Sequence, residues 1–154
     1  MAQDQNLEAS GSRVAGFTAP KKAPFFGALV LAVRDGEGWR LKDFDTVEIN
    51  ASFYSWPTVA GVQAWRRQSR DRDFVYTVKV CELITHVKRF KATKTLINDF
   101  GLIADILGAR MGCFLFQLPP SYRYTRARLN AIVSQLDPAR RNVVEFRHAS
   151  WWNL

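Results

Sequence analysis

The segment Thr93–Leu118, TKTLINDFGLIADILGARMGCFLFQL, combines a helix pattern and a strand pattern in one continuous stretch. Thr93 is typical of a helix N-cap and Gly108 of a helix end. The part Gly112–Leu118 is rich in aromatic and aliphatic residues, which favours a strand. Between the two ends, apolar residues recur at the i, i+3, i+4, i+7 spacing of one helix face: Leu96, Ile97, Phe100, Ile103, Ala104 and Leu107. A helix that leads directly into a strand is the repeating unit of α/β folds.

The same alternation continues on both sides of this segment. Further strands are predicted at Thr46–Asn50, Phe74–Val80 and Asn142–Arg147. A helix at Thr58–Ser69 would place Val59, Val62 and Trp65 on one face, and a helix at Thr125–Leu136 would do the same for Leu129, Ile132, Val133 and Leu136. Successive strands begin roughly 30 residues apart, which is the length of a βαβ unit. The order βαβαβαβ therefore predicts parallel strands joined by helical crossovers.

Side chains alternate between the two faces of a strand. One face is apolar throughout: Val47, Ile49, Tyr76, Val78, Phe114, Phe116, Leu118, Val144 and Phe146. The other face is mostly polar: Thr46, Glu48, Asn50, Thr77, Lys79, Cys113, Leu115, Gln117, Val143, Glu145 and Arg147. A doubly wound sheet is apolar on both faces because helices cover both. We therefore expect an α/β fold, a TIM-type (β/α) barrel with parallel strands, external helices and a polar interior.

Residues 1–40 form an atypical and partly disordered segment by composition. The apolar run Phe25–Val33 fits either a strand or a short buried helix. The longest apolar stretch, Pro24–Val33, is far shorter than the ~20 residues of a membrane-spanning helix. Because the N-terminus also lacks the pattern of a secretory signal, we expect a cytoplasmic protein without a membrane partner.

The chain has 154 residues, which is the size of one domain, and a formal charge of +8. Its two cysteines exclude a disulfide-stapled scaffold. The positive charge favours anionic partners, so a small anionic ligand is the expected partner. Nucleic acid is an alternative partner, but no nucleic-acid-binding motif is present and the basic residues are scattered.

The carboxyl ends of barrel strands line the mouth where barrel enzymes hold their active sites. Four residues there have the chemistry of general acids and bases, namely Glu48, His86, Glu145 and His148. Seven more are candidate ligand-binding residues: Asn50, Tyr54, Lys79, Thr85, Gln117, Arg147 and Trp151. Lys79 and Arg147 would neutralise an anionic substrate.

Each of these residues has a plainer interpretation. Glu145 and Arg147 can form an internal ion pair, the histidines can be structural, and Trp151 or Trp152 can anchor the next helix. Two histidines and two carboxylates are of the right type for a metal, but no compact ligand spacing is present. We therefore predict no metal site, and the sequence identifies no cofactor.

Four motifs carry a resemblance to a known family. They are FDTVEINASFYSWP (Phe44–Pro57), TVKV with ITHVKR (Thr77–Arg89), FQLPPSYRY (Phe116–Tyr124) and VVEFRHASWW (Val143–Trp152). They resemble the YecE-like family, domain of unknown function 72, over about Asp43–Leu154. The resemblance implies a TIM-type barrel and no established activity. It supports these motif positions: Glu48, Asn50, Tyr54, Lys79, Thr85, His86, Lys88, Gln117, Pro119, Pro120, Glu145, Arg147, His148 and Trp151.

Two departures from the family pattern affect what we expect. The glycine-rich first-strand motif is missing from Met1–Arg40, and the family pattern continues beyond Leu154. The resemblance therefore implies an incomplete, partial TIM-type (β/α) barrel over residues 41–154. About half a barrel would remain, with exposed strand edges that favour self-association. A truncated, inactive fragment is therefore the alternative hypothesis to a ligand-binding barrel protein.

Overall fold

The computed structural model describes residues 45–71 and 73–152. The predictions for residues 1–40, including the Phe25–Val33 run, lie outside these ranges. The helices and strands follow one another as β1 (Thr46–Ile49), α1 (Ala51–Tyr54), α2 (Val59–Gln68), β2 (Val75–Lys79), the π-helix η2 (Leu83–Val87), α3 (Lys94–Leu107), the 3₁₀ helix η3 (Gly108–Arg110), β3 (Met111–Gln117), α4 (Arg126–Gln135), β4 (Asn142–Glu145) and the 3₁₀ helix η4 (Ala149–Trp151).

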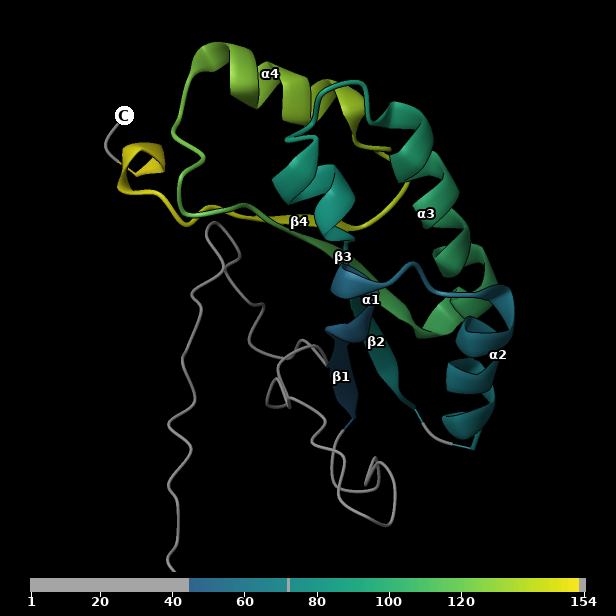
Figure 1. Cartoon of the computed structure of the whole chain (residues 1–154). Coiled ribbons are helices and arrows are strands. Elements are labelled where there is room, and N and C mark those ends of the chain that lie inside the picture. Colours follow the sequence, from purple (N-terminus) through teal and green to yellow (C-terminus); the bar gives the residue numbers. More distant parts are fainter. Residues whose placement is uncertain (1–44, 72, 153–154) are drawn as a thin grey trace, which may run out of the picture.

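The four strands form one sheet in the order β1-β2-β3-β4, and every neighbouring pair is parallel. Figure 1 shows the long helices α2, α3 and α4 around the outside of this curved sheet. Parallel strands in sequence order with helices on the outer face are the arrangement of a partial TIM-type barrel. The predicted fold class and strand direction are therefore confirmed.

The hydrophobic core lies between the outer face of the sheet and the helices. Val78, Phe114 and Phe116 from the strands are at most 3% exposed, and Phe100 and Leu107 from α3 pack into the same cluster. Burying one such side chain contributes roughly 1.5–3 kcal/mol. The apolar face predicted from alternation is thus the face that the helices cover.

Two residues predicted for helix core faces are exposed instead. Val59 is 61% exposed and Val133 is 63% exposed. In α2 the buried residue is Val62, and in α4 it is Ile132. Each of these helices meets the core along a narrow stripe, so a residue at the helix start or beside the stripe faces outward.

A threonine precedes each of the three long helices, although the sequence predicted an N-cap only at Thr93. Thr58 and Thr125 cap α2 and α4 through their side chains, which accept from the amides of Gly61 and Arg128 at 3.1 Å. The Thr93 side chain makes no such cap on α3. Its hydroxyl and its amide instead donate to Gln135 Oε1, both at 2.7 Å, which ties the start of α3 to the end of α4.

Strand β3 contains a bulge at Gly112. The pairing with β2 moves from Tyr76 opposite Met111 to Thr77 opposite Cys113, so Gly112 is an extra residue on β3. The bulge changes the phase of the alternation. Met111 and Phe114 therefore both belong to the core although they are an odd number of residues apart.

No helix within residues 45–71 and 73–152 combines the length and the apolarity that crossing a bilayer requires.

Candidate functional site

The inner face of the sheet carries the polar side chains. Register places Glu48 beside Thr77, which is itself beside Cys113. Closer to the carboxyl ends, Gln117 lies beside Glu145. Lys79 is on the same face as these residues, one alternation beyond Thr77. Four candidate residues from four strands thus share the face that the long helices leave uncovered: Glu48, Lys79, Gln117 and Glu145.

Glu48 occupies an environment that disfavours its charged form. Burial raises the pKa of its carboxyl above the ordinary value of 4.5, and the charge of Glu145 raises it further. Lys79 and a hydrogen bond from Asn50 lower this pKa, but the net shift is upward. A carboxyl with a raised pKa exchanges its proton closer to neutral pH, which suits a general acid or base.

Helix α1 places an aromatic ring between a lysine and a histidine. The Ser52 hydroxyl donates to the carbonyl oxygens of Ile49 and Lys79, each at 2.6 Å, and so fixes α1 to the ends of β1 and β2. The next residue, Phe53, has the Lys79 ammonium 4.8 Å from its ring centroid. The His86 ring meets the same phenyl ring edge-on at 4.9 Å. Lys79 and His86 therefore both contact the Phe53 ring.

His86 lies in the π-helix η2, a rare element that is frequent at functional sites. Its Nδ1 atom shares a hydrogen bond of 2.8 Å with the hydroxyl of the buried Thr85. Burial lowers the pKa of the imidazole, and the nearby charges of Lys79, Arg147 and Arg89 lower it further against the opposing effect of Glu82. The ring is therefore held neutral among cations.

Glu145 is 5% exposed, which is unusual for a carboxylate. Gln117 Nε2 donates to its Oε2 atom at 2.8 Å. This hydrogen bond fixes the orientation of the carboxylate toward the inner face. The suggested ion pair with Arg147 is not among the salt bridges of the described residues, and Arg147 is exposed beyond the end of β4.

Of three further predicted site residues, His148 and Trp151 make contacts away from this cluster and Tyr54 lies at its edge. His148 Nδ1 accepts from the amide of Ser150 at 3.0 Å and caps η4. The Trp151 indole is 7% exposed and donates to the Tyr122 carbonyl oxygen at 2.7 Å. Tyr54 is 75% exposed and touches Phe53 edge-on. Of the two tryptophans, Trp151 is thus the buried one.

Sequence reasoning missed Ser52 and Phe53. The signal for both is a small polar residue followed by an aromatic residue shortly after a strand, where βα loops of barrels carry functional groups. Arg89 fits two interpretations from sequence, an anion-binding residue at the mouth or part of a solvated basic surface. Within residues 45–71 and 73–152, no group of three or more His, Cys, Asp or Glu side chains is placed to hold a metal ion.

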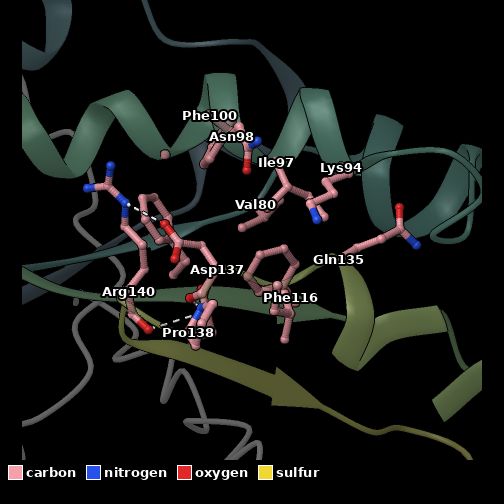
Figure 2. Close-up of a pocket in the computed structure, with 14 residues that line it drawn as sticks. Val80, Lys94, Ile97, Asn98, Phe100, Phe116, Gln135, Asp137, Pro138 and Arg140 are labelled. Atoms are coloured by element: carbon pink, nitrogen blue, oxygen red, sulfur yellow. Dashed lines mark hydrogen bonds and ion pairs between the residues drawn. The ribbon is translucent and has the colours of Figure 1, made fainter. Parts of the chain in front are cut away.

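A cavity of about 440 Å³ lies on the other face of the sheet, between α3 and the loop that joins α4 to β4 (Figure 2). Its floor is apolar and includes Phe114 and Phe116. Arg140 at its edge is engaged with Asp105 at 2.7 Å and with Asp137 at 3.5 Å. Because the charges at this edge neutralise one another and the cavity is remote from Glu48, we take the inner face as the candidate site.

The raised pKa of Glu48 predicts a pH dependence of stability. Between pH 4.5 and the higher pKa of the folded state, the folded chain binds the Glu48 proton more tightly than the unfolded chain. The contribution of this group to stability therefore falls as pH rises through that window. We expect urea denaturation to show that the advantage of Glu48→Gln over the wild type grows from pH 4.5 to pH 7.5. The exposed residue Asp99 gives a control, Asp99→Asn, and a gap for Glu48→Gln that is constant with pH would contradict the prediction.

The fold and the inner face define the class of the protein: a partial TIM-type barrel with polar side chains on its inner face. A family model described as a protein of unknown function, DUF72, matches residues 40–154. The chain belongs to this DUF72 family.

Solved structures of the same family share the fold. A crystal structure of a DUF72 family protein from Enterococcus faecalis V583 has a TM-score of 0.60 and 21% identity, over 72% of this chain and 47% of that chain. The DUF72 family protein from Thermotoga maritima MSB8 has a TM-score of 0.55 and 28% identity, over 70% and 43%. The chain thus spans less than half the length of these structures. No curated protein matches the chain.

Proposed function

We propose that the carboxyl end of this sheet binds a small anionic or polyhydroxylated ligand, and that Glu48 acts there as a general acid or base. The observation that carries the proposal is the convergence of Lys79 and His86 on the Phe53 ring, at 4.8 and 4.9 Å. A cation and a neutral imidazole then flank the same region as a carboxyl with a raised pKa. Barrel enzymes hold such groups at this end of the strands.

The roles of the residues follow from their charges and contacts. Lys79 and Arg147 compensate the negative charge of the ligand. The positive charges of the same two residues also lower the pKa of His86. His86 is neutral near physiological pH and can accept a proton or donate a hydrogen bond. Glu145, oriented by Gln117, accepts hydrogen bonds from ligand hydroxyl groups. The reaction that these groups support is proton transfer to or from the bound ligand.

The experiment is a binding assay on the purified full chain. The probes are malate, glucose 6-phosphate, inorganic phosphate and uncharged glucose. Their binding is measured by isothermal titration calorimetry and by thermal shift. We expect at least malate or glucose 6-phosphate to bind. Lys79→Ala and Arg147→Ala should each weaken that binding by about tenfold, which corresponds to ~1.4 kcal/mol.

A matched control removes a positive charge from elsewhere. Arg67 is exposed near the end of α2, on the helical outer layer. Arg67→Ala should leave the affinity unchanged. Equal losses in Arg67→Ala and Lys79→Ala would mean that only net charge matters, and the proposed site would then be wrong. Failure of every probe to bind the wild type would also overturn it.

A further inference from the structure

The rim beyond β2 and β3 is strongly basic. The segments Leu83–Asn98 and Leu118–Leu136, which follow the carboxyl ends of β2 and β3, contain no Asp or Glu. They contribute the positive residues Lys88, Arg89, Lys91, Lys94, Arg123, Arg126 and Arg128. Among them, Arg89 and Arg128 are held close to one aromatic residue, Tyr122.

The two arginines approach Tyr122 from different elements. The Tyr122 hydroxyl donates to the carbonyl oxygen of Arg89 at 3.4 Å, and the Arg128 guanidinium lies 5.0 Å from the Tyr122 ring centroid. Both guanidinium charges act on the Tyr122 hydroxyl, whose pKa they lower against the rise caused by burial. Tyr122 is itself 3% exposed, so it is a fixed support for both.

The charges of these arginines are not compensated by the partners that hold them. Arg89 donates to the hydroxyl of Ser121 at 3.2 Å and to the carbonyl oxygen of His86 at 3.4 Å. Arg128 donates to the carbonyl oxygen of Arg123 at 2.8 Å. Arg140, in contrast, makes a two-pronged ion pair with Asp105. Neutral acceptors position a guanidinium without cancelling its charge, so Arg89 and Arg128 keep their charge for an external anion.

The backbone that carries Arg89 is strained. Arg89, Phe90 and Ala92 have φ values of +48°, +59° and +49°, in the region that favours glycine. The surroundings hold this conformation, because Phe90 is 1% exposed and its carbonyl oxygen accepts from Gln135 Nε2 at 2.5 Å. Strain that is maintained in this way is concentrated at functional sites. Here it turns Arg89 toward Ser121 on the neighbouring loop.

We propose that Arg89 and Arg128, supported by Tyr122, form a subsite for the phosphoryl group of a small phosphorylated substrate. A guanidinium presents paired donors that match phosphate oxygens. Arg89 also acts electrostatically on His86, which links this rim subsite to the mouth. The inference rests on the proposed function for the body of the ligand and adds the class of the substrate, a phosphate monoester whose other anionic or hydroxyl-bearing part reaches Lys79 and His86.

The test separates the rim from the mouth. Binding of inorganic phosphate, glucose 6-phosphate and malate is measured by calorimetry on the full chain and on three variants: the double variant Arg89→Ala with Arg128→Ala, the charge-preserving double variant Arg89→Lys with Arg128→Lys, and Lys79→Ala. Thermal melting of each variant shows that it is folded. We expect the alanine pair to weaken the binding of glucose 6-phosphate and of phosphate at least tenfold and to leave the affinity for malate unchanged. The lysine pair should recover only part of this loss.

The outcomes distinguish the two proposals. If Lys79→Ala weakens the binding of malate while the alanine pair leaves the affinity for phosphate unchanged, the proposed function is supported and the rim subsite is overturned. If binding of phosphate depends on the two arginines but Lys79→Ala changes the affinity for neither malate nor glucose 6-phosphate, the rim subsite stands without the proposed function. A single-stranded oligonucleotide that binds more than tenfold tighter than glucose 6-phosphate and requires the same arginines would replace the small substrate by nucleic acid and overturn the inference.

Discussion

Replacing Trp151 by alanine is expected to lower the free energy of unfolding by about 3–5 kcal/mol. The indole is 7% exposed and stacks on Phe146 at 4.1 Å. Its ring also meets Tyr124 edge-on at 5.1 Å, and its N–H donates to the Tyr122 carbonyl oxygen. Truncation would therefore remove aromatic contacts, leave a cavity and orphan a carbonyl oxygen together.

The neighbouring tryptophan provides the matched control. Trp152 is 53% exposed and touches Phe146 only at 6.3 Å, so Trp152→Ala should change stability by no more than about 0.5 kcal/mol. Urea denaturation of both variants measures the two changes in the free energy of unfolding. Trp151→Phe should retain most of the packing that Trp151→Ala loses. A loss below about 1 kcal/mol for Trp151→Ala, or equal losses for the two tryptophans, would show that Trp151 is not the anchor that its contacts indicate.

The same contacts bear on how the rim is built. Trp151 holds Tyr122 through the carbonyl hydrogen bond and a parallel stack at 6.2 Å. Tyr122 in turn supports Arg89 and Arg128. The 3₁₀ helix η4, which follows β4, therefore stabilises the loop that follows β3, and Trp151 thereby supports the residue on which the rim cations rest.

Local patterns made the layers of the fold predictable. Alternation along β2 places Tyr76 and Val78 on one face and Lys79 on the other, and this property of the chain does not depend on its neighbours. Helix α3 has apolar residues at regular helical spacing, and the structure places it within a residue of its predicted range. Glu48 and Lys79 could be assigned to a common face for the same reason.

The parts of the site that the sequence did not predict depend on contacts between distant parts of the chain. Helix α1 is four residues long and is held by a hydrogen bond from Ser52 to Lys79, 27 residues away. The π-helix η2 has the sequence LITHV, which follows neither a helix nor a strand period. His86 in this helix was predicted as a site residue, but the contact between its ring and Phe53 was not predicted. His148, assigned to catalysis by type and position, makes its hydrogen bonds as a cap because Ser150 lies two residues further on.

The polar interior also has an energetic consequence. Burial disfavours the charged form of Glu48, and Glu145 lies near enough to repel it. A chain selected for stability alone would place apolar residues on this face, since an interior carboxylate lowers stability unless it is fully paired. If Glu48 acts as proposed, retaining this carboxyl is a stability–activity trade-off.

Replacing Gly112 by alanine is expected to lower the free energy of unfolding by about 1–3 kcal/mol. A Cβ atom at this position would lie 2.7 Å from Val75 Cγ1 and 3.0 Å from the carbonyl oxygen of Tyr76. The valine side chain can move, but the carbonyl belongs to the neighbouring strand of the bulge and is fixed by the sheet. Relief of the contact must therefore push β2 and β3 apart, and those strands carry Lys79 and Gln117.

An identical substitution in α3 should have the opposite sign. A Cβ atom on Gly101 would meet Arg140 Nε at 3.5 Å, which is ordinary contact, and alanine favours the helix by about 0.5–1 kcal/mol. Chemical denaturation of Gly112→Ala and Gly101→Ala side by side should thus show a loss and a gain from the same added methyl group. Equal shifts in the two variants would mean that the bulge tolerates a side chain. In that case, the register between β2 and β3, which separates the polar interior from the core, would not depend on their close approach at Gly112.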